Sequence, residues 1–290
     1  MEKIFIDFSK TNGIIKPMNA VNNGPVVGNV RNMKKTSIKF FEEAAFPYAR
    51  NHDASFYEPY GGEHIVDVHR IFKNFDADET DPASYWFEPT DYYLKQIINY
   101  GGKVFYRLGA SIEHYFKYGT RVPKDYAKWA RICEHIIMHY TEGWANGFKY
   151  DIEYWEIWNE PDCRDANGVG PCWQGTDEEF IDFYEVTAKH LKTCFPHLKI
   201  GGPAFTNPWH TDFKRAFLKA VKERKIPFDF YSYHWYGMHI KDFIETLEEA
   251  QNELKLAGLE GTPTILNEWN YIRGWIDDLW DYSLATEKTL

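Results

Sequence analysis

The sequence predicts an α/β fold in which parallel strands close into a (β/α)8 barrel, or TIM barrel, and three observations indicate it. Short apolar strands alternate with longer amphipathic helices, which is the pattern of a parallel sheet. No glycine-rich dinucleotide-binding fingerprint follows the first strand. Polar residues crowd the ends of several strands, where barrels build their active sites: Arg50, Asn51, His52, Asn159, Glu160, His234 and Glu268.

Seven segments are predicted as the core strands, and no good candidate for an eighth strand follows them. After Glu268 the remaining segment 277–288 has the pattern of a helix. An open barrel would leave backbone groups unpaired at its edges, which predicts a homo-oligomer or reduced stability. The predicted strands are Gly24–Gly28, Phe46–His52, Lys103–Leu108, Tyr154–Asn159, Lys199–Pro203, Phe228–His234 and Thr264–Glu268.

Apolar residues at three- and four-residue spacing predict the helices that connect these strands. Thr176 followed by Glu179 has the spacing of a capping box at the start of one of them. Before the barrel, Ile4, Ile6 and Phe8 alternate like one face of a short strand. We therefore expect residues 1–14 to be separate from a barrel domain of residues 15–290. The predicted helices are Asp125–Tyr140, Glu178–Thr193, Asp212–Glu223 and Lys241–Leu256.

Composition restricts the kind of partner. The net charge of −10 disfavours nucleic acid, because phosphate contacts need clustered Lys and Arg. No stretch approaches the ~18 apolar residues of a membrane span. The N-terminus lacks the apolar run of a signal peptide, so we expect a cytoplasmic protein as written, or a secreted or periplasmic one whose signal was removed. The aromatic content of 18% fits either sugar-ring faces or an aromatic core.

The cysteines and histidines do not predict a metal site. None of Cys133, Cys163, Cys172 and Cys194 forms a CxxC pair, and no HExxH spacing occurs. We therefore expect no metal and no cofactor. Cys163 and Cys172 lie nine residues apart in a loop rich in Gly and Asp, and they could form a disulfide in an oxidising compartment.

Glu160 ends the fourth predicted strand and is the first of two candidate catalytic carboxylates. Pro161 follows it directly and cannot continue a ladder. The side chain is therefore expected to point towards the barrel mouth. Because side chains alternate along a strand, four residues are expected to share one face: Tyr154, Glu156, Trp158 and Glu160.

Glu268 ends the seventh predicted strand and is the second candidate. By the same alternation, Thr264, Leu266 and Glu268 are expected to share a face. About three βα units separate Glu268 from Glu160, so the two carboxylates should lie across the barrel mouth from each other. Trp269, the aromatic residue that follows Glu268, is a candidate for sugar binding.

Two facing carboxylates can hydrolyse an acetal. One protonates the leaving oxygen, while the other attacks the anomeric carbon or activates a water molecule. A gap of about 5–5.5 Å implies retention and about 6.5–9.5 Å implies inversion. The sequence alone leaves both routes open.

Inward residues of neighbouring strands could support such a pair. Arg50 could hold one carboxylate ionised, and Tyr236 could donate a hydrogen bond to it. Glu156, one layer below Glu160, should pair with Arg50 or another polar group, because a lone buried charge is costly. For Arg50 and His234 a structural network is the alternative, and His52 is the weakest of these candidates. By alternation, Ser232, His234 and Tyr236 share one face, as do Tyr48, Arg50 and His52.

The motif WEIWNEPD resembles the acid/base motif of clan A glycoside hydrolases, in which Asn-Glu-Pro ends strand four. The wider sequence resembles glycoside hydrolase family 39, the family of β-xylosidases and α-L-iduronidases. The pieces that carry this resemblance span roughly residues 15 to 270: IKPMNAVNNGP, DVHRIFKNFDADETDPASYWFEPTD, YRLGASIE, WEIWNEPD, KIGGPAF, SYHWYG and ILNEWN.

The resemblance implies a retaining β-glycoside hydrolase, β-xylosidase-like, with Glu160 as acid/base and Glu268 as nucleophile. It implies that Asn159 binds the 2-hydroxyl of the sugar and that His52 contacts the sugar. His234 and Tyr236 match residues of strand six near the nucleophile. A carbohydrate substrate is the expected partner.

Two departures from the family pattern leave alternatives open. Similar proteins carry an eighth strand and an accessory β-domain, to which Lys3–Phe8 would belong, and neither is evident before Leu290. Asn267-Glu268-Trp269-Asn270 replaces the more usual Thr-Glu-Phe-Asn of xylosidases, so another sugar could be the substrate. A non-catalytic or disabled saccharide-binding barrel is the main alternative, and a lyase or isomerase on the same barrel is the other.

Overall fold

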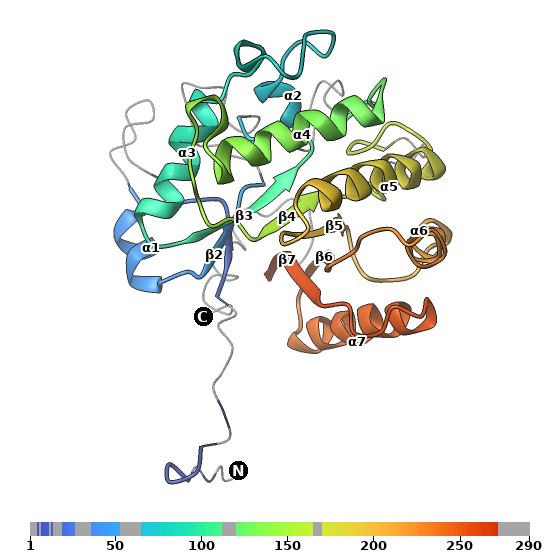
Figure 1. The fold of residues 1–290 in the computed structure, drawn as a ribbon. Coiled ribbons are helices and arrows are strands. Elements are labelled where there is room, and N and C mark those ends of the chain that lie inside the picture. Colours follow the sequence, from blue (N-terminus) through green and yellow to red (C-terminus); the bar gives the residue numbers. More distant parts are fainter. Residues whose placement is uncertain are drawn as a thin grey trace.

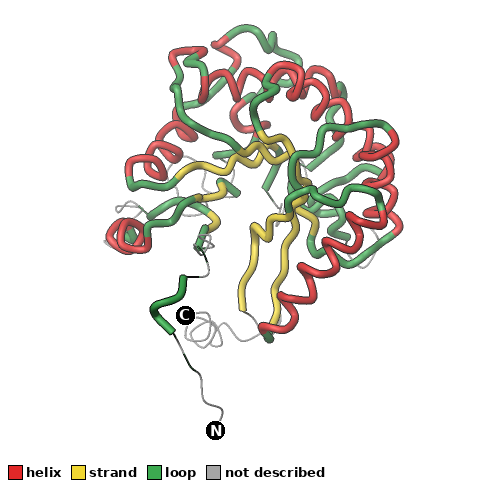
Figure 2. The backbone as a smooth tube through the Cα atoms, turned by 60° about the horizontal axis from the view of Figure 1, so that its bottom comes forward, coloured by secondary structure: helices red, strands yellow, loops and turns green. Residues whose placement is uncertain are grey.

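A computed structural model describes residues 5, 7–11, 13, 19–26, 36–52, 65–111, 120–164 and 170–271. Its strands form a seven-stranded parallel sheet in sequence order, which curves into a nearly closed barrel with the helices outside (Figures 1 and 2). The predicted barrel with seven strands is therefore confirmed. The strands are β1 Val21–Asn22, β2 Tyr48–Arg50, β3 Lys103–Leu108, β4 Tyr154–Ile157, β5 Lys199–Phe205, β6 Tyr231–Gly237 and β7 Thr264–Tyr271.

The two ends of the sheet, β1 and β7, lie close to each other, yet no ladder joins them in the described part of the chain. The residues of β7 are only half-buried, apart from exposed Trp269, whereas those of β3 and β5 are buried except for their first residues. The barrel is thus less well covered at β7 than at β3 and β5, and no eighth strand lies within the described residues. Whether this edge leads to a homo-oligomer stays a prediction.

Helices cover the outer face of the sheet (Figure 1). Three of the long ones begin at a residue whose side chain accepts from a backbone amide of the first turn, namely Asp125, Thr176 and Thr211. The predicted capping box of Thr176 and Glu179 is confirmed: Thr176 Oγ1 accepts from the Glu179 amide at 3.1 Å and Glu179 Oε2 accepts from the Thr176 amide at 2.7 Å. The helices are α1 Ile38–Ala44, α2 Val68–Ile71, α3 Glu88–Asn99, α4 Tyr126–Thr141, α5 Asp177–Cys194, α6 Asp212–Glu223 and α7 Ile240–Leu256, with short 3-10 turns at Pro82–Ser84 and Trp144–Asn146.

Aromatic side chains fill the inside and the outside of the sheet. Four rings from β2, β3, β4 and the residue before β6 contact one another edge-on or stacked, beneath the layer that holds the polar site. They give that layer a rigid apolar support. The rings are those of Tyr48, Phe105, Tyr154 and Phe230.

The predicted first strand was wrong. We expected Gly24–Gly28, but the strand is Val21–Asn22 and the described residues 24–26 lie outside it. The Gly24 amide donates to the Tyr93 hydroxyl, and a Cβ on Gly24 would lie 2.6 Å from Ile97 Cγ1. Pro25 has no N–H for a ladder. Gly24 thus packs closely against α3 instead of joining the sheet. The other predicted strands differ from the observed ones only at their ends.

The N-terminal prediction is tested only in part. Of the expected strand Lys3–Phe8, only Phe5, Asp7 and Phe8 are described, and none of them lies in a strand. Ile4, Ile6 and the expected helix 277–288 lie outside the described residues. The division at residue 14 stays a prediction, as does the cellular compartment. No helix in the described ranges is long and apolar enough to cross a membrane.

Candidate active site

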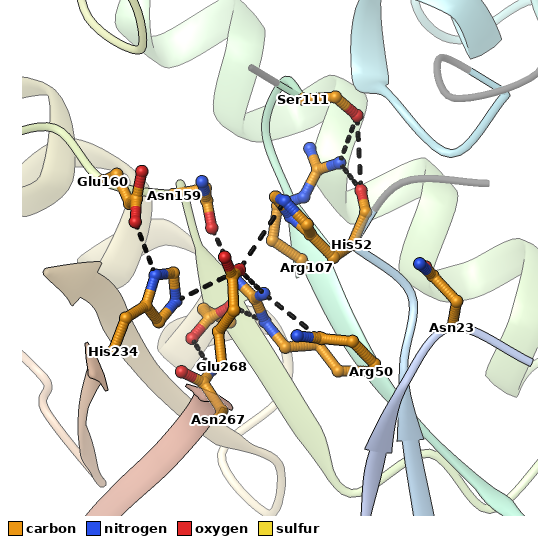
Figure 3. A network of polar contacts seen from close by, with 12 residues as sticks. Asn23, Arg50, His52, Arg107, Ser111, Asn159, Glu160, His234, Asn267 and Glu268 are labelled. Atoms are coloured by element: carbon orange, nitrogen blue, oxygen red, sulfur yellow. Dashed lines mark hydrogen bonds and ion pairs between the residues drawn. The ribbon is translucent and has the colours of Figure 1, made fainter. Parts of the chain in front are cut away.

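Polar side chains from four strands meet at the carboxyl ends of the barrel strands (Figure 3). Arg50 ends β2, Asn159 and Glu160 follow β4, His234 lies in β6 and Glu268 in β7. In a parallel barrel these strand ends surround one mouth, so residues distant in sequence come together there. The strand-end residues singled out in the sequence therefore lie close together, while their roles stay predictions.

The turn after β4 places Glu160, and it breaks the expected alternation. The strand ends at Ile157, and two non-glycine residues then adopt positive φ angles, 76° at Trp158 and 47° at Glu160. Trp158 was expected to face inwards, but its ring packs outside the sheet against Trp129 and Trp173. Left-handed backbone at such residues is costly and is concentrated at functional sites. This change in backbone direction points the side chain of Asn159 into the barrel.

A bulge in β7 places Glu268. Tyr233 pairs with Leu266, while the next residue of β6, His234, pairs with Glu268, so β7 holds one extra residue. That residue is Asn267, whose Nδ2 donates to Glu156 Oε1 at 2.6 Å inside the barrel. Strict alternation would have turned Asn267 outwards. The bulge instead directs two consecutive side chains, Asn267 and Glu268, to the interior.

Glu268 is surrounded by groups that favour its charge. Arg50 Nη1 lies 3.2 Å from Oε2, and the Tyr236 hydroxyl donates to Oε1 at 2.7 Å. His52 Nε2 and His234 Nε2 each lie 3.6 Å from Oε2. Burial opposes ionisation, but the charges of the two imidazoles and the guanidinium, with the Tyr236 hydrogen bond, hold the pKa of Glu268 well below its usual range.

Glu160 has a different environment. His234 Nδ1 lies 2.7 Å from Glu160 Oε1, so the imidazole bridges the two carboxylates. Burial lowers the pKa of His234, but Glu268 and Glu160 outweigh it and raise that pKa.

One carboxylate oxygen of each Glu and one His234 nitrogen lie within 4.8 Å of one another. These three donors could coordinate a cation, but Arg50 already supplies positive charge at Glu268 and disfavours one.

Glu156 lies below both carboxylates and fixes the residues around them. Its Oε2 accepts from Arg50 Nε at 2.7 Å, and its Oε1 accepts from Ser232 Oγ and Asn267 Nδ2, each at 2.6 Å. The predicted pairing of Glu156 with Arg50 is confirmed. Arg50 also donates to Asn159 Oδ1 at 2.7 Å. Arg50 is thereby held in one orientation between Glu156, Asn159 and Glu268.

Replacing Arg50 with Met should destabilise the protein by about 3–5 kcal/mol, because Glu156 would remain as an uncompensated buried charge. Both side chains are at most 3% exposed. Urea denaturation measures this difference in the free energy of unfolding. The control is Lys103→Ala, which removes the exposed pair with Asp151 and should leave that free energy nearly unchanged. Equal effects of the two substitutions would contradict the assigned role of the buried pair.

The structure brings together seven of the eight predicted site residues. The exception is Trp269, which is 45% exposed and whose ring contacts Phe243 of α7, with centroids 5.6 Å apart. Its sugar-binding role has no support from this position. The seven that meet are Arg50, His52, Asn159, Glu160, His234, Tyr236 and Glu268.

Sequence reasoning missed two residues of the site. Asn267 was missed because the bulge cannot be read from alternation. Arg107 of β3 is fully buried and donates to the His52 carbonyl and to Asp67 Oδ1, the latter at 2.7 Å, so it fixes the loop that carries His52. Arg107 could have been identified from the sequence, because it is a charged residue inside the apolar run Lys103–Leu108.

The four cysteines are free, and the disulfide considered for Cys163 and Cys172 is not formed in this structure. Their Sγ atoms nevertheless lie within 4.8 Å of each other.

Three comparisons place the chain among known proteins. The model of glycosyl hydrolases family 39 matches residues 53–272. A β-xylosidase of Caldicellulosiruptor saccharolyticus is 25% identical over 261 residues, which are 82% of this chain and 48% of that protein. A β-xylosidase of Geobacillus stearothermophilus is 34% identical over 154 residues, 48% of this chain and 27% of that protein.

The solved structure of a glucosidase from Croceicoccus marinus superposes with a TM-score of 0.77 at 24% identity, over 91% of this chain and 54% of that one. This likeness supports the fold. The chain spans about half, or less, of the length of each of these relatives.

Proposed function

The chain belongs to glycosyl hydrolases family 39, and we propose that it is a retaining β-glycoside hydrolase that acts by double displacement. In this proposal Glu160 is the acid/base and Glu268 is the nucleophile. The observation that carries it is the pair of carboxylates, whose oxygens approach within 4.8 Å across the strand ends. This approach favours the separation of about 5–5.5 Å between the carboxyl groups of retaining enzymes over the roughly 6.5–9.5 Å of inverting ones, which leave room for a water molecule.

The two environments support the division of roles. A nucleophile must be ionised, and Arg50, His52, His234 and Tyr236 all stabilise the charged form of Glu268. Glu160 has a single polar side-chain contact, His234, among the described hydrogen bonds and ion pairs. Its carboxyl is therefore the better candidate to hold and release a proton.

In the first step, Glu160 would protonate the glycosidic oxygen as Glu268 attacks the anomeric carbon, giving a glycosyl-enzyme ester and the free alcohol. In the second, Glu160 would take a proton from water, whose oxygen displaces Glu268. We assign Asn159 and His52 to sugar hydroxyls. Asn159 is held for this by Arg50 Nη2, and His52 by the contact of Arg107 with its carbonyl.

The proposed substrate is a β-xyloside, because the relatives from Geobacillus stearothermophilus and Caldicellulosiruptor saccharolyticus are each named a β-xylosidase. Proton NMR of aryl β-xyloside hydrolysis tests the stereochemistry, and we expect β-xylose to appear before the α anomer grows by mutarotation. An α anomer formed first would contradict retention. Aryl β-glucoside and β-galactoside, tested in parallel, check the choice of sugar.

A non-catalytic saccharide-binding barrel is the second candidate, and the weakly covered strand β7, which carries Glu268, favours it. It predicts calorimetric binding of xylo-oligosaccharides with no release of sugar over days. Hydrolysis that depends on Glu268 would eliminate it.

A further inference from the structure

Two cysteines lie beside Glu160 and have no part in the proposed chemistry. The Sγ atoms of Cys163 and Cys172 and one carboxylate oxygen of Glu160 lie within 4.8 Å of one another. Both cysteines are free. The pair is therefore close enough to be oxidised with only local movement of the chain.

The backbone of each cysteine is connected to the turn that carries Glu160. The Cys163 amide donates to the Glu160 carbonyl at 3.0 Å. The Cys172 carbonyl accepts from Trp158 Nε1 at 2.8 Å. Arg164 Nη1 donates to the carbonyls of Pro161 and Trp173 and so connects the two arms of the loop. A change in the sulfur–sulfur distance will therefore be transmitted to Glu160.

The two thiols differ in a way that suits disulfide exchange. Cys163 is half-buried, and the hydrogen bond from Cys172 lowers its pKa. Cys172 is 1% exposed, and that hydrogen bond, together with burial, raises its pKa. The thiolate is the attacking species, so Cys163 is the better attacking group and Cys172 the resolving one.

We infer that Cys163 and Cys172 form a reversible disulfide that displaces Glu160 and lowers hydrolytic activity. The effect on activity rests on the proposed function; the bond itself does not. The oxidant is a low-molecular-weight disulfide such as glutathione disulfide.

The exchange proceeds in two steps. The Cys163 thiolate attacks one sulfur of glutathione disulfide and releases a glutathione thiolate. The Cys172 thiolate, after its proton passes to solvent, attacks the Cys163 sulfur and releases the second glutathione thiolate. The two protein thiols lose two electrons and two protons, and the oxidant becomes two molecules of glutathione.

The direction of the effect follows from burial. Disulfide sulfurs lie about 2.05 Å apart, closer than two thiols that are not bonded to each other. Cys172 is buried and held by Trp158, so Cys163 must make most of the movement and shift the Glu160 carbonyl that its amide contacts. A displacement near 1 Å at a catalytic group can lower the rate by about 100-fold. We expect a loss of about 10-fold to 100-fold, restored by dithiothreitol.

The experiment incubates the full chain with glutathione disulfide and follows three quantities. Peptide mapping identifies the bond between Cys163 and Cys172. Hydrogen exchange reports on the backbone of residues 158–164. Hydrolysis of an aryl β-xyloside reports on activity, before and after dithiothreitol. Cys172→Ser should stop at a mixed disulfide on Cys163, and Cys194→Ser, which removes an exposed cysteine elsewhere, should behave like the parent.

The expected result is the bond, altered exchange at residues 158–164 and reversible loss of hydrolysis. Failure of the bond to form, or a bond that changes neither exchange nor hydrolysis, would overturn the inference. If the reduced chain hydrolyses no glycoside, the proposed function fails, while the bond and the exchange still decide whether this dithiol controls the turn at Glu160.

Discussion

Replacing Glu268 with Ala should lower kcat/KM for an aryl β-xyloside by about 10⁴-fold or more, because the covalent route loses its nucleophile. The adjacent Asn267 cannot replace this carboxylate, because it is neutral and is bonded to Glu156. Azide should restore turnover of this variant by entering the vacated space, and it should give the α-glycosyl azide, since one displacement inverts the anomeric carbon.

Glu260→Gln is the matched control for Glu268→Ala. Glu260 is exposed in the loop before β7, so its replacement should leave kcat/KM unchanged. Loss of the Glu268 carboxylate with unchanged hydrolysis would refute its role as nucleophile. Circular dichroism of the variant shows whether the fold persists.

Replacing Glu160 with Ala should have an effect that depends on the leaving group. General acid catalysis contributes about 10²–10⁴-fold, and a poor leaving group such as an alkyl alcohol needs all of it. A dinitrophenolate leaves without protonation. We therefore expect hydrolysis of an alkyl β-xyloside to fall by that factor, while formation of the glycosyl-enzyme from the dinitrophenyl β-xyloside remains nearly normal.

Azide distinguishes this variant from Glu268→Ala. The glycosyl-enzyme of Glu160→Ala lacks the base for water, and azide, which needs no base, should accelerate its breakdown and give the β-glycosyl azide. Kinetics with both leaving groups and NMR of the azide product are the measurements. An equal loss for both leaving groups would contradict the assignment of Glu160 as acid/base.

The position of the site could be predicted from alternation and strand ends. Pro161 indicated that the chain leaves the sheet near Glu160, although the fourth strand itself ends earlier, at Ile157. The cost of a lone buried charge correctly paired Glu156 with Arg50. On the sixth strand, which is regular, Ser232, His234 and Tyr236 point to one face as predicted: they contact Glu156, Glu160 and Glu268 in turn. Alternation is reliable along a strand that holds no extra residue, as this one does not, because the bulge belongs to β7.

The irregular parts of the site could not be predicted in this way. Left-handed backbone at Trp158 and Glu160 runs against the preference of both residue types, so it depends on tertiary packing. Gly109 packs directly against this turn, since a Cβ on Gly109 would lie 3.1 Å from the Trp158 Cα. The bulge at Asn267 is set by its pairing with β6. Local sequence carries no signal for either.

The central claim is that Glu268 forms a covalent bond to the sugar, and trapping that intermediate tests it most directly. The chain is incubated with 2,4-dinitrophenyl 2-deoxy-2-fluoro-β-xyloside, which slows both steps but keeps a good leaving group. Intact mass spectrometry should show one added fluoroxylosyl unit, and peptide mapping should place it on Glu268. A label on another residue, or inverted product released without any adduct, would contradict the account.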